Sequence, residues 1–152
     1  MKLLLDTNLL VAALVARGAC ADLLEHCVRQ HVIVSSQPLL DELREVLERK
    51  FRQSAVDVRA ALHLFGEKFT LVVVPDALEQ PVCRDSDDDV VLATALAGEC
   101  AAIITGDEDL LTLDTFRSIR VLAPSAFWKW ECERGDVTTP ERGPRIEGED
   151  TD

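Results

Sequence analysis

The sequence predicts a single α/β domain built on a mainly parallel β-sheet. Short apolar runs alternate with longer amphipathic stretches along the chain, which is the pattern of repeated βαβ units. A length of 152 residues and a hydrophobic content of 47% fit one compact domain with its own core. Glycine and proline are sparse, so the composition excludes collagen-like and low-complexity proteins.

The individual elements follow from these patterns in chain order. Five short apolar runs are the predicted strands, at residues 2–5, 32–34, 71–74, 102–105 and 119–122. Six amphipathic stretches are the predicted helices, at residues 9–15, 20–30, 38–52, 56–69, 87–98 and 125–133. Ser36 and Pro38 are start signals for the third helix. Ser86 can cap the fifth helix, with Asp89 three residues on as in a capping box.

The end of the chain differs from the rest in composition. Residues 131–152 carry eight acidic side chains against three arginines, and their only aliphatic residues are Val137 and Ile146. Such a segment buries too little apolar surface to offset the entropy lost on ordering. We therefore expect a folded domain at residues 1–130 and a flexible acidic tail at residues 131–152.

The net charge of −12 restricts the classes of function. It argues against a passive nucleic-acid-binding module, because phosphate contacts require lysine and arginine. It leaves a metal-dependent nuclease open, since there the carboxylates bind a cation and the cation binds the phosphate.

Cysteine usage and the N-terminus bear on cellular location. The five cysteines are odd in number and form no C-x-x-C pair, so we expect reduced, mostly buried thiols in a cytoplasmic protein. The apolar N-terminal stretch resembles a secretory signal, but Asp6 and Asn8 interrupt it. Its longest uninterrupted run is also too short to span a bilayer, so we expect neither export nor membrane insertion.

Acidic residues follow two of the predicted strands. Asp6 comes directly after the first strand, and Asp107 comes just after the fourth. Open parallel sheets bind ligands outside the carboxyl ends of their strands, so these two carboxylates can belong to one site.

Two further acids lie on the apolar side of predicted helices. Glu42 is three residues after Leu39 and four before Val46, and Asp88 precedes Val91 by three residues. Inward charges are costly unless they are paired or bound to a metal, so a shared cation is one explanation. Each acid also has a simpler explanation, as a helix cap, a helix-dipole partner, a boundary residue or a turn residue. The coincidence of four such acids favours the metal site.

Three stretches of the sequence resemble the PIN domain family. They are LLLDTNLL at the start, SSQPLLDELREVL in the middle, and CRDSDDDVVLATALAGECAAIITGDEDLL near the end. The likeness runs from Lys2 to about Trp128, and it is strongest to the toxin components of bacterial toxin–antitoxin systems, the VapC-like ribonucleases. The order and spacing of these motifs make the resemblance specific.

The resemblance implies a three-layer α/β/α fold around a parallel sheet of about five strands. It also implies metal-dependent cleavage of single-stranded RNA, with a small antitoxin protein as partner and with dimers as a common state. The implied catalytic and metal-binding acids are Asp6, Glu42, Asp88 and Asp107, with Asp87 and Asp109 as auxiliary acids and Asn8 and Thr105 as polar supports.

The expected cofactor is one or two Mg²⁺ or Mn²⁺ ions, because hard oxygen ligands suit these ions. Asp6, Asp88 and Asp107 would be the main ligands, while Glu42 would bind a second ion or orient the attacking water. A basic group at Arg44, Arg49, Lys50 and Arg52 either contacts the RNA backbone or is a solvated charged face.

Three different functions stay open at the level of sequence. A phosphatase of the haloacid-dehalogenase type also begins with an aspartate after a strand, but it needs a second acid where this chain has Asn8. A housekeeping RNA-processing nuclease is the second, and a non-catalytic RNA- or protein-binding domain is the third. Late aromatic residues, namely Phe127, Trp128 and Trp130, form either a dimer interface or a terminal helix that docks on the core.

Overall fold

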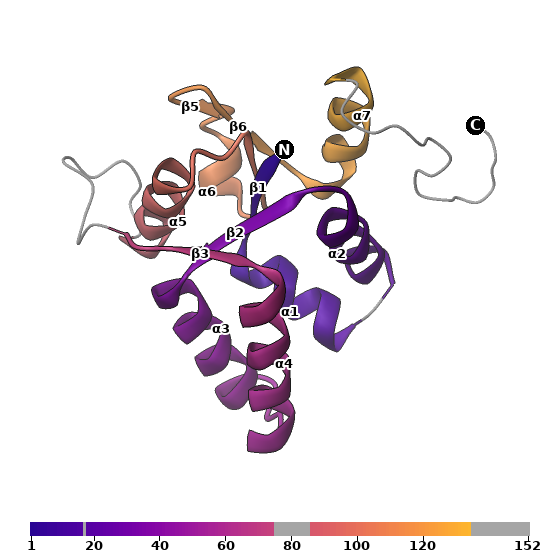
Figure 1. The fold of residues 1–152 in the computed structure, drawn as a ribbon, viewed down its shortest axis with the longest axis vertical. Helices are drawn as coiled ribbons and strands as arrows, with labels where there is room; N and C mark the ends of the chain where they lie inside the picture. The colour runs from indigo at the N-terminus through magenta and orange to yellow at the C-terminus, as the bar shows by residue number, and fades with distance from the viewer. Residues whose placement is uncertain (17, 75–85, 135–152) are drawn as a thin grey trace.

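The computed structural model describes residues 1–16, 18–74 and 86–134, and these residues form an α/β fold (Figure 1). The strands are β1 (Lys2–Leu5), β2 (Val32–Ser36), β3 (Thr70–Val72), β4 (Ala102–Ile104), β5 (Thr115–Phe116) and β6 (Ile119–Leu122). The helices are α1 (Thr7–Val15), α2 (Ala19–Gln30), α3 (Gln37–Arg49), α4 (Ala55–Lys68), α5 (Ser86–Ala97), α6 (Glu108–Leu111) and α7 (Pro124–Arg134).

The six strands form one sheet in the order β3-β2-β1-β4-β6-β5. Every neighbouring pair is parallel except β5 and β6, which pair antiparallel at one edge. The predicted mainly parallel sheet is therefore confirmed, with a short antiparallel strand added. Strand β1 lies near the centre, between β2 and β4, so its carboxyl end is surrounded by other strand ends.

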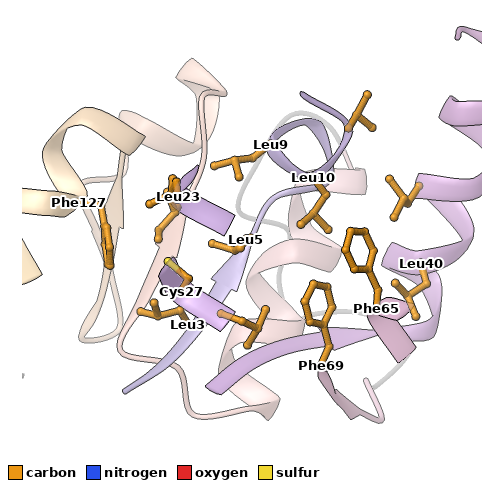
Figure 2. Packing of buried hydrophobic residues seen from close by; sticks show 14 of the residues in the cluster. Leu3, Leu5, Leu9, Leu10, Leu23, Cys27, Leu40, Phe65, Phe69 and Phe127 are labelled. Atoms are coloured by element: carbon orange, nitrogen blue, oxygen red, sulfur yellow. The ribbon is translucent and has the colours of Figure 1, made fainter. Parts of the chain in front are cut away.

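Alternating side chains on the strands bury both faces of the sheet. Leu3 and Leu5 of β1 belong to one apolar cluster, with residues of α1, α2, α3, α4 and α7. Figure 2 shows this cluster, in which Phe65 and Phe69 stack with ring centroids 4.8 Å apart. Leu4 points to the opposite face and joins a second cluster with residues of α5 and α6. The sheet thus lies between two helical layers, as the three-layer prediction requires.

Most elements agree with their predicted positions, and the differences have local causes. Strands β1 and β6 have the predicted bounds. Helix α1 begins at Thr7, two residues earlier than predicted, because Asp6 caps it. Helix α3 ends at Arg49, three residues early, and Arg52 beyond it has a left-handed φ of 51°. Helix α6 and strand β5 are absent from the predicted elements.

The C-terminal helix extends past the predicted domain boundary at residue 130. Helix α7 continues to Arg134, and Glu131 is only 2% exposed. Phe127 is fully buried in the core, and Trp128 and Trp130 pack against the same cluster. The late aromatic residues therefore dock a terminal helix on the core. The remainder of the predicted tail, residues 135–152, is outside the described part of the chain.

The helices are short relative to the thickness of a membrane. Within the described residues, no single helix is long and apolar enough to cross one. Helices α1 and α2 reach the required length and composition only when taken together, and a bend of 114° separates them.

Candidate metal centre

The carboxyl ends of the central strands bring the first acid and its neighbour together. Strands β1 and β4 pair in parallel with Leu5 opposite Ile104, so Asp6 and Thr105 leave the sheet at the same level. The Asp6 amide continues the ladder and donates to the Ile104 carbonyl over 3.0 Å. This is the edge at which open parallel sheets bind ligands.

Asp6 is a buried carboxylate held by two hydrogen bonds. It is 6% exposed, and its Oδ1 accepts from the Thr7 amide over 2.8 Å. Its Oδ2 accepts from the Thr105 hydroxyl, also over 2.8 Å. Burial raises the pKa of Asp6, the two hydrogen bonds lower it, and the nearby charge of Asp107 raises it again. The net pKa is above the ordinary value, so the fold holds this carboxylate at a cost that a cation would offset.

Thr105 connects the acids that follow β1 and β4. Its side chain is fully buried, and its hydroxyl accepts from the Asp107 amide over 3.0 Å while donating to Asp6. Asp107 in turn caps α6, since its Oδ1 accepts from the Asp109 amide over 2.8 Å. One hydroxyl thus fixes the spacing between the Asp6 carboxylate and the turn that carries Asp107.

Helix α5 adds a third segment to this group. Asp88 lies in its first turn and is 8% exposed. One carboxylate oxygen from each of Asp88, Asp107 and Asp109 lies within 4.8 Å of the others. The helix is held at this depth by a polar contact further along, where Ser36 and Thr94 hydroxyls are 2.9 Å apart and Thr94 donates to the Val90 carbonyl.

Glu42 joins the group from α3 through a threonine. It is partly buried, and its Oε1 accepts from the Thr7 hydroxyl over 3.4 Å. Thr7 is itself 2% exposed and donates its amide to Asp6. The structure therefore links three of the four predicted acids in one chain of contacts, from Glu42 through Thr7, Asp6 and Thr105 to the Asp107 turn, and Asp88 lies close to Asp107.

The remaining predicted site residues are exposed or are not described by the structure. Asn8 is exposed on the first turn of α1, and the side chain of Asp87 is not among those the structure describes. Arg49 and Lys50 are exposed at the end of α3, where Arg49 pairs with Glu45. Arg49 comes seven positions after Glu42 in the helix, which is about 10 Å along the axis.

The donor set suits a hard divalent cation. Asp88, Asp107 and Asp109 offer only carboxylate oxygens, and Mg²⁺ and Mn²⁺ prefer such ligands. Asp88 is buried among these acids, where converging negative charges repel each other without a counter-ion. The residues present therefore fit the expected cofactor.

Sequence reasoning missed the structural role of two short polar side chains. Thr7 bridges Asp6 and Glu42, and Ser36 joins the end of β2 to α5. Thr7 comes two residues after the end of β1, Ser36 is the last residue of β2, and both are almost fully buried. A hydroxyl residue at the buried end of a predicted strand can be used to predict such a contact, because a buried hydroxyl needs a hydrogen-bond partner.

Comparisons with known proteins bear on the fold and the family. The family model of the PIN domain matches residues 2–109. One similar chain belongs to the crystal structure of VapBC2 from Rickettsia felis bound to a DNA fragment from their promoter. The two chains are 16% identical with a TM-score of 0.60, and the match covers 81% of this chain and 98% of that one. The likeness shows a shared fold. No match was found among curated proteins.

Proposed function

This chain belongs to the PIN domain family, a family of nucleases, and we propose that it is a metal-dependent ribonuclease that hydrolyses phosphodiester bonds of single-stranded RNA. The observation that carries the proposal is the convergence of the Asp88, Asp107 and Asp109 carboxylates beside the buried Asp6. The family membership supports nuclease chemistry, and the oxygen-only donor set supports a hard divalent ion as its cofactor.

The acids would have different roles, set by their positions in the site. Asp6, Asp88 and Asp107 would hold Mg²⁺ or Mn²⁺, with Asp109 and Asp87 as auxiliary ligands. Such an ion, when bound, supplies Lewis-acid chemistry that acidifies water and polarises a phosphoryl oxygen. Glu42, oriented by the Thr7 hydroxyl, would accept a hydrogen bond from the attacking water or help to hold a second ion.

Thr105 would act through its neighbours. Its hydroxyl binds both Asp6 and the Asp107 amide, so it holds two ligands in one arrangement. Outer-sphere groups of this kind tune the ligands that they orient. Asn8, in the first turn of α1, would contact the substrate or water at the rim of the site.

RNA binding would depend more on the cation than on the surface charge. The chain has a net charge of −12, and the exposed basic residues at the end of α3 lie about two helical turns from Glu42. The RNA would be contacted by Arg49, Lys50 and Arg52 only if it extends along α3 beyond the cleavage position.

We further propose that the protein is the toxin of a toxin–antitoxin pair, with a small antitoxin protein as its partner. The motif resemblance to VapC-like ribonucleases supports this role, as does the shared fold with a chain of a VapBC2 assembly. Dimerisation is a related proposal from the family. A housekeeping nuclease and a non-catalytic binding domain are the competing functions, since fold alone does not determine function.

The direct experiment is cleavage of a labelled single-stranded RNA in Mn²⁺ and in EDTA. Wild type is compared with Asp6→Asn, Asp107→Asn and Glu42→Gln. Asp41→Asn is the matched control, because Asp41 precedes Glu42 on α3 but is exposed and pairs with Arg44. We expect cleavage in Mn²⁺ only, a loss of several orders of magnitude in the site variants, and full activity in Asp41→Asn.

Two different results would change the conclusion. Equal activity in wild type and in Asp6→Asn would place the reaction elsewhere or in a contaminant. Inactivity of every protein, with Mn²⁺ binding preserved, would favour a binding role.

A further inference from the structure

A second cluster of ionisable side chains lies at the opposite end of the sheet. His31 directly precedes β2, whose Val32 pairs with Lys2 at the amino end of β1. His26 comes from α2, and Glu131 comes from α7. The candidate metal centre is at the carboxyl ends of the same strands, so the length of the sheet separates the two clusters.

The two imidazoles point at a single carboxylate oxygen. The Nε2 atom of His26 is 2.7 Å from Glu131 Oε2, and the Nε2 atom of His31 is 2.5 Å from the same oxygen. The three atoms all lie within 4.8 Å of one another. The side chains of His31 and Glu131 are 0% and 3% exposed, whereas that of His26 is 16% exposed, which leaves one approach from solvent.

Neighbouring groups fix both rings in this orientation. The Met1 amino nitrogen lies 3.2 Å from Nδ1 of His31, on the far side of the ring from Glu131. The His26 ring is tilted against Trp128 with centroids 4.7 Å apart, and Phe127 meets both imidazoles edge-on. The donor atoms are therefore held together by packing as well as by hydrogen bonds.

The chemistry of the donors differs from that of the carboxylate centre. Two imidazole nitrogens and one carboxylate are a common three-ligand set for Zn²⁺, with a fourth position left for water. Nitrogen ligands favour zinc and the later transition metals, whereas Mg²⁺ prefers oxygen alone. Burial raises the pKa of Glu131, but the hydrogen bonds and charges of the two histidines lower it further than that.

We propose that His26, His31 and Glu131 form a binding site for Zn²⁺ or a similar transition-metal ion, separate from the carboxylate centre. A tetrahedral zinc with bonds of about 2.0–2.2 Å holds its ligands about 3.4 Å apart. The two Nε2–Oε2 separations must therefore widen by less than about 1 Å when the ion binds. The ion would replace the protons that the two Nε2 atoms share with Glu131, and these protons would be released to solvent. The bound ion would fasten α7 to α2 and to the start of β2.

A second histidine–glutamate pair provides an internal control. His63 and Glu67 lie on α4 at positions i and i+4, with 3.3 Å between Nε2 and Oε2. Their side chains are 76% and 65% exposed, and neither belongs to a group of three possible ligands among the described residues. This pair has the residue types of the proposed site without its third ligand or its burial.

The test is calorimetric titration of the full, untagged, EDTA-stripped chain with Zn²⁺ in a large excess of Mg²⁺. We expect one zinc equivalent per chain, and we expect Co²⁺ at the same site to give the visible absorption of a four-coordinate ion. His26→Asn should weaken zinc binding by at least roughly tenfold. His63→Asn should bind zinc as wild type does.

Glu131→Gln provides a second variant that keeps the shape and a hydrogen-bond acceptor for the histidines. We expect it to fold, as circular dichroism would show, and to lose zinc affinity together with the Co²⁺ absorption. The absence of any zinc equivalent in wild type would overturn the proposal. Wild-type affinity in both His26→Asn and Glu131→Gln would overturn it equally, and the cluster would then be a hydrogen-bonded link only.

Discussion

At the scale of single residues, Asp6 is a proposed metal ligand whose burial costs stability when no metal is bound. Its pKa is raised above the ordinary value of 3.8, because burial outweighs the hydrogen bonds from Thr105 and Thr7. A raised carboxyl pKa favours the folded state only while the group is protonated, and that contribution is lost as the pH rises through the folded pKa. At neutral pH, without metal, the ionised Asp6 therefore destabilises the fold.

Asp6→Asn should accordingly abolish cleavage while raising the melting temperature of the metal-free protein at pH 7 by a few degrees. The difference in melting temperature between the variant and wild type should become smaller in acid, near pH 4, where the wild-type carboxyl is increasingly protonated. Thermal unfolding in EDTA at several pH values measures both effects. A variant less stable than wild type at pH 7 would contradict this account of the site.

Thr105→Val tests the hydroxyl that joins two acids. Valine has nearly the same shape, but it cannot donate to Asp6 or accept from the Asp107 amide. We expect a loss of about 1–3 kcal/mol in unfolding free energy. We also expect a fall of roughly 10–100-fold in metal affinity or cleavage rate. Thr112→Val is the control, because that exposed threonine bonds only locally, to the Asp109 carbonyl.

At the scale of elements, a glycine can be required at a helix end either for a left-handed backbone conformation or for close packing, and the end of α5 shows which applies at Gly98. The Cys100 amide donates to the Ala95 carbonyl and the Glu99 amide donates to the Leu96 carbonyl, which is a Schellman ending. Glu99, not Gly98, has the left-handed φ of 54°. A Cβ on Gly98 would come within 2.5 Å of Val34 Cγ1, so this glycine is needed for close packing of α5 on β2.

Two adjacent substitutions should therefore have opposite effects. Gly98→Ala should destabilise the fold by about 1–3 kcal/mol, because Val34 is buried and overpacking forces a shift. Glu99→Gly should stabilise it by roughly 0.5–1 kcal/mol, since relief of the left-handed conformation exceeds the added chain entropy. Urea denaturation of both variants gives the comparison. A stabilising Gly98→Ala would refute the packing argument.

The elements that sequence can and cannot predict differ in length and periodicity. The parallel strands and long helices have apolar repeats of sufficient length, and their predicted positions are correct to within a few residues. Helix α6 has four residues and β5 has two, so neither is long enough for a periodic apolar pattern to be recognised in the sequence. In the site, Glu42 and Asp88 are identifiable as charges on apolar helix faces, and Asp6 and Asp107 are identifiable by their positions after strands. The threonines that join them have no such pattern, because a single hydroxyl has no periodicity.

At the scale of the whole molecule, the charge opposes the proposed substrate. The chain carries −12, and RNA is a polyanion, so association in the absence of counter-ions is repulsive. Most nucleic-acid-binding proteins show the reverse, because their cationic side chains release counter-ions on binding. For this protein, added salt should therefore not weaken RNA binding, in contrast to its effect on most nucleic-acid-binding proteins.

Raising monovalent salt from about 20 mM to about 150 mM should lower the KM for RNA or leave it unchanged, because salt screens the repulsion. Steady-state cleavage at constant Mn²⁺ measures the effect. A steep rise in KM with salt would instead indicate that basic residues such as Lys50 and Arg52 dominate binding. Lys50→Glu would then be expected to weaken binding strongly.

Metal binding should also be visible as a property of the whole fold. At concentrations about 100 times the dissociation constant, Mn²⁺ should stabilise the native state by about 2.7 kcal/mol, a rise of about 5–10 °C in melting temperature. Asp107→Asn should reduce this shift, and Asp41→Asn should not. An unchanged melting temperature at millimolar Mn²⁺ would count against the carboxylate centre.

The position of β4 beside β1 has a consequence for the synthesis of the protein. Asp6 and Glu42 leave the ribosome early, but the Thr105–Asp107 turn emerges only after two thirds of the chain has been translated. The acids of the two segments meet when Ala102 pairs with Leu3 across the sheet. A nascent chain therefore carries no complete set of the proposed acids until β4 has paired with β1, so on the proposed function it could not cleave RNA before that point.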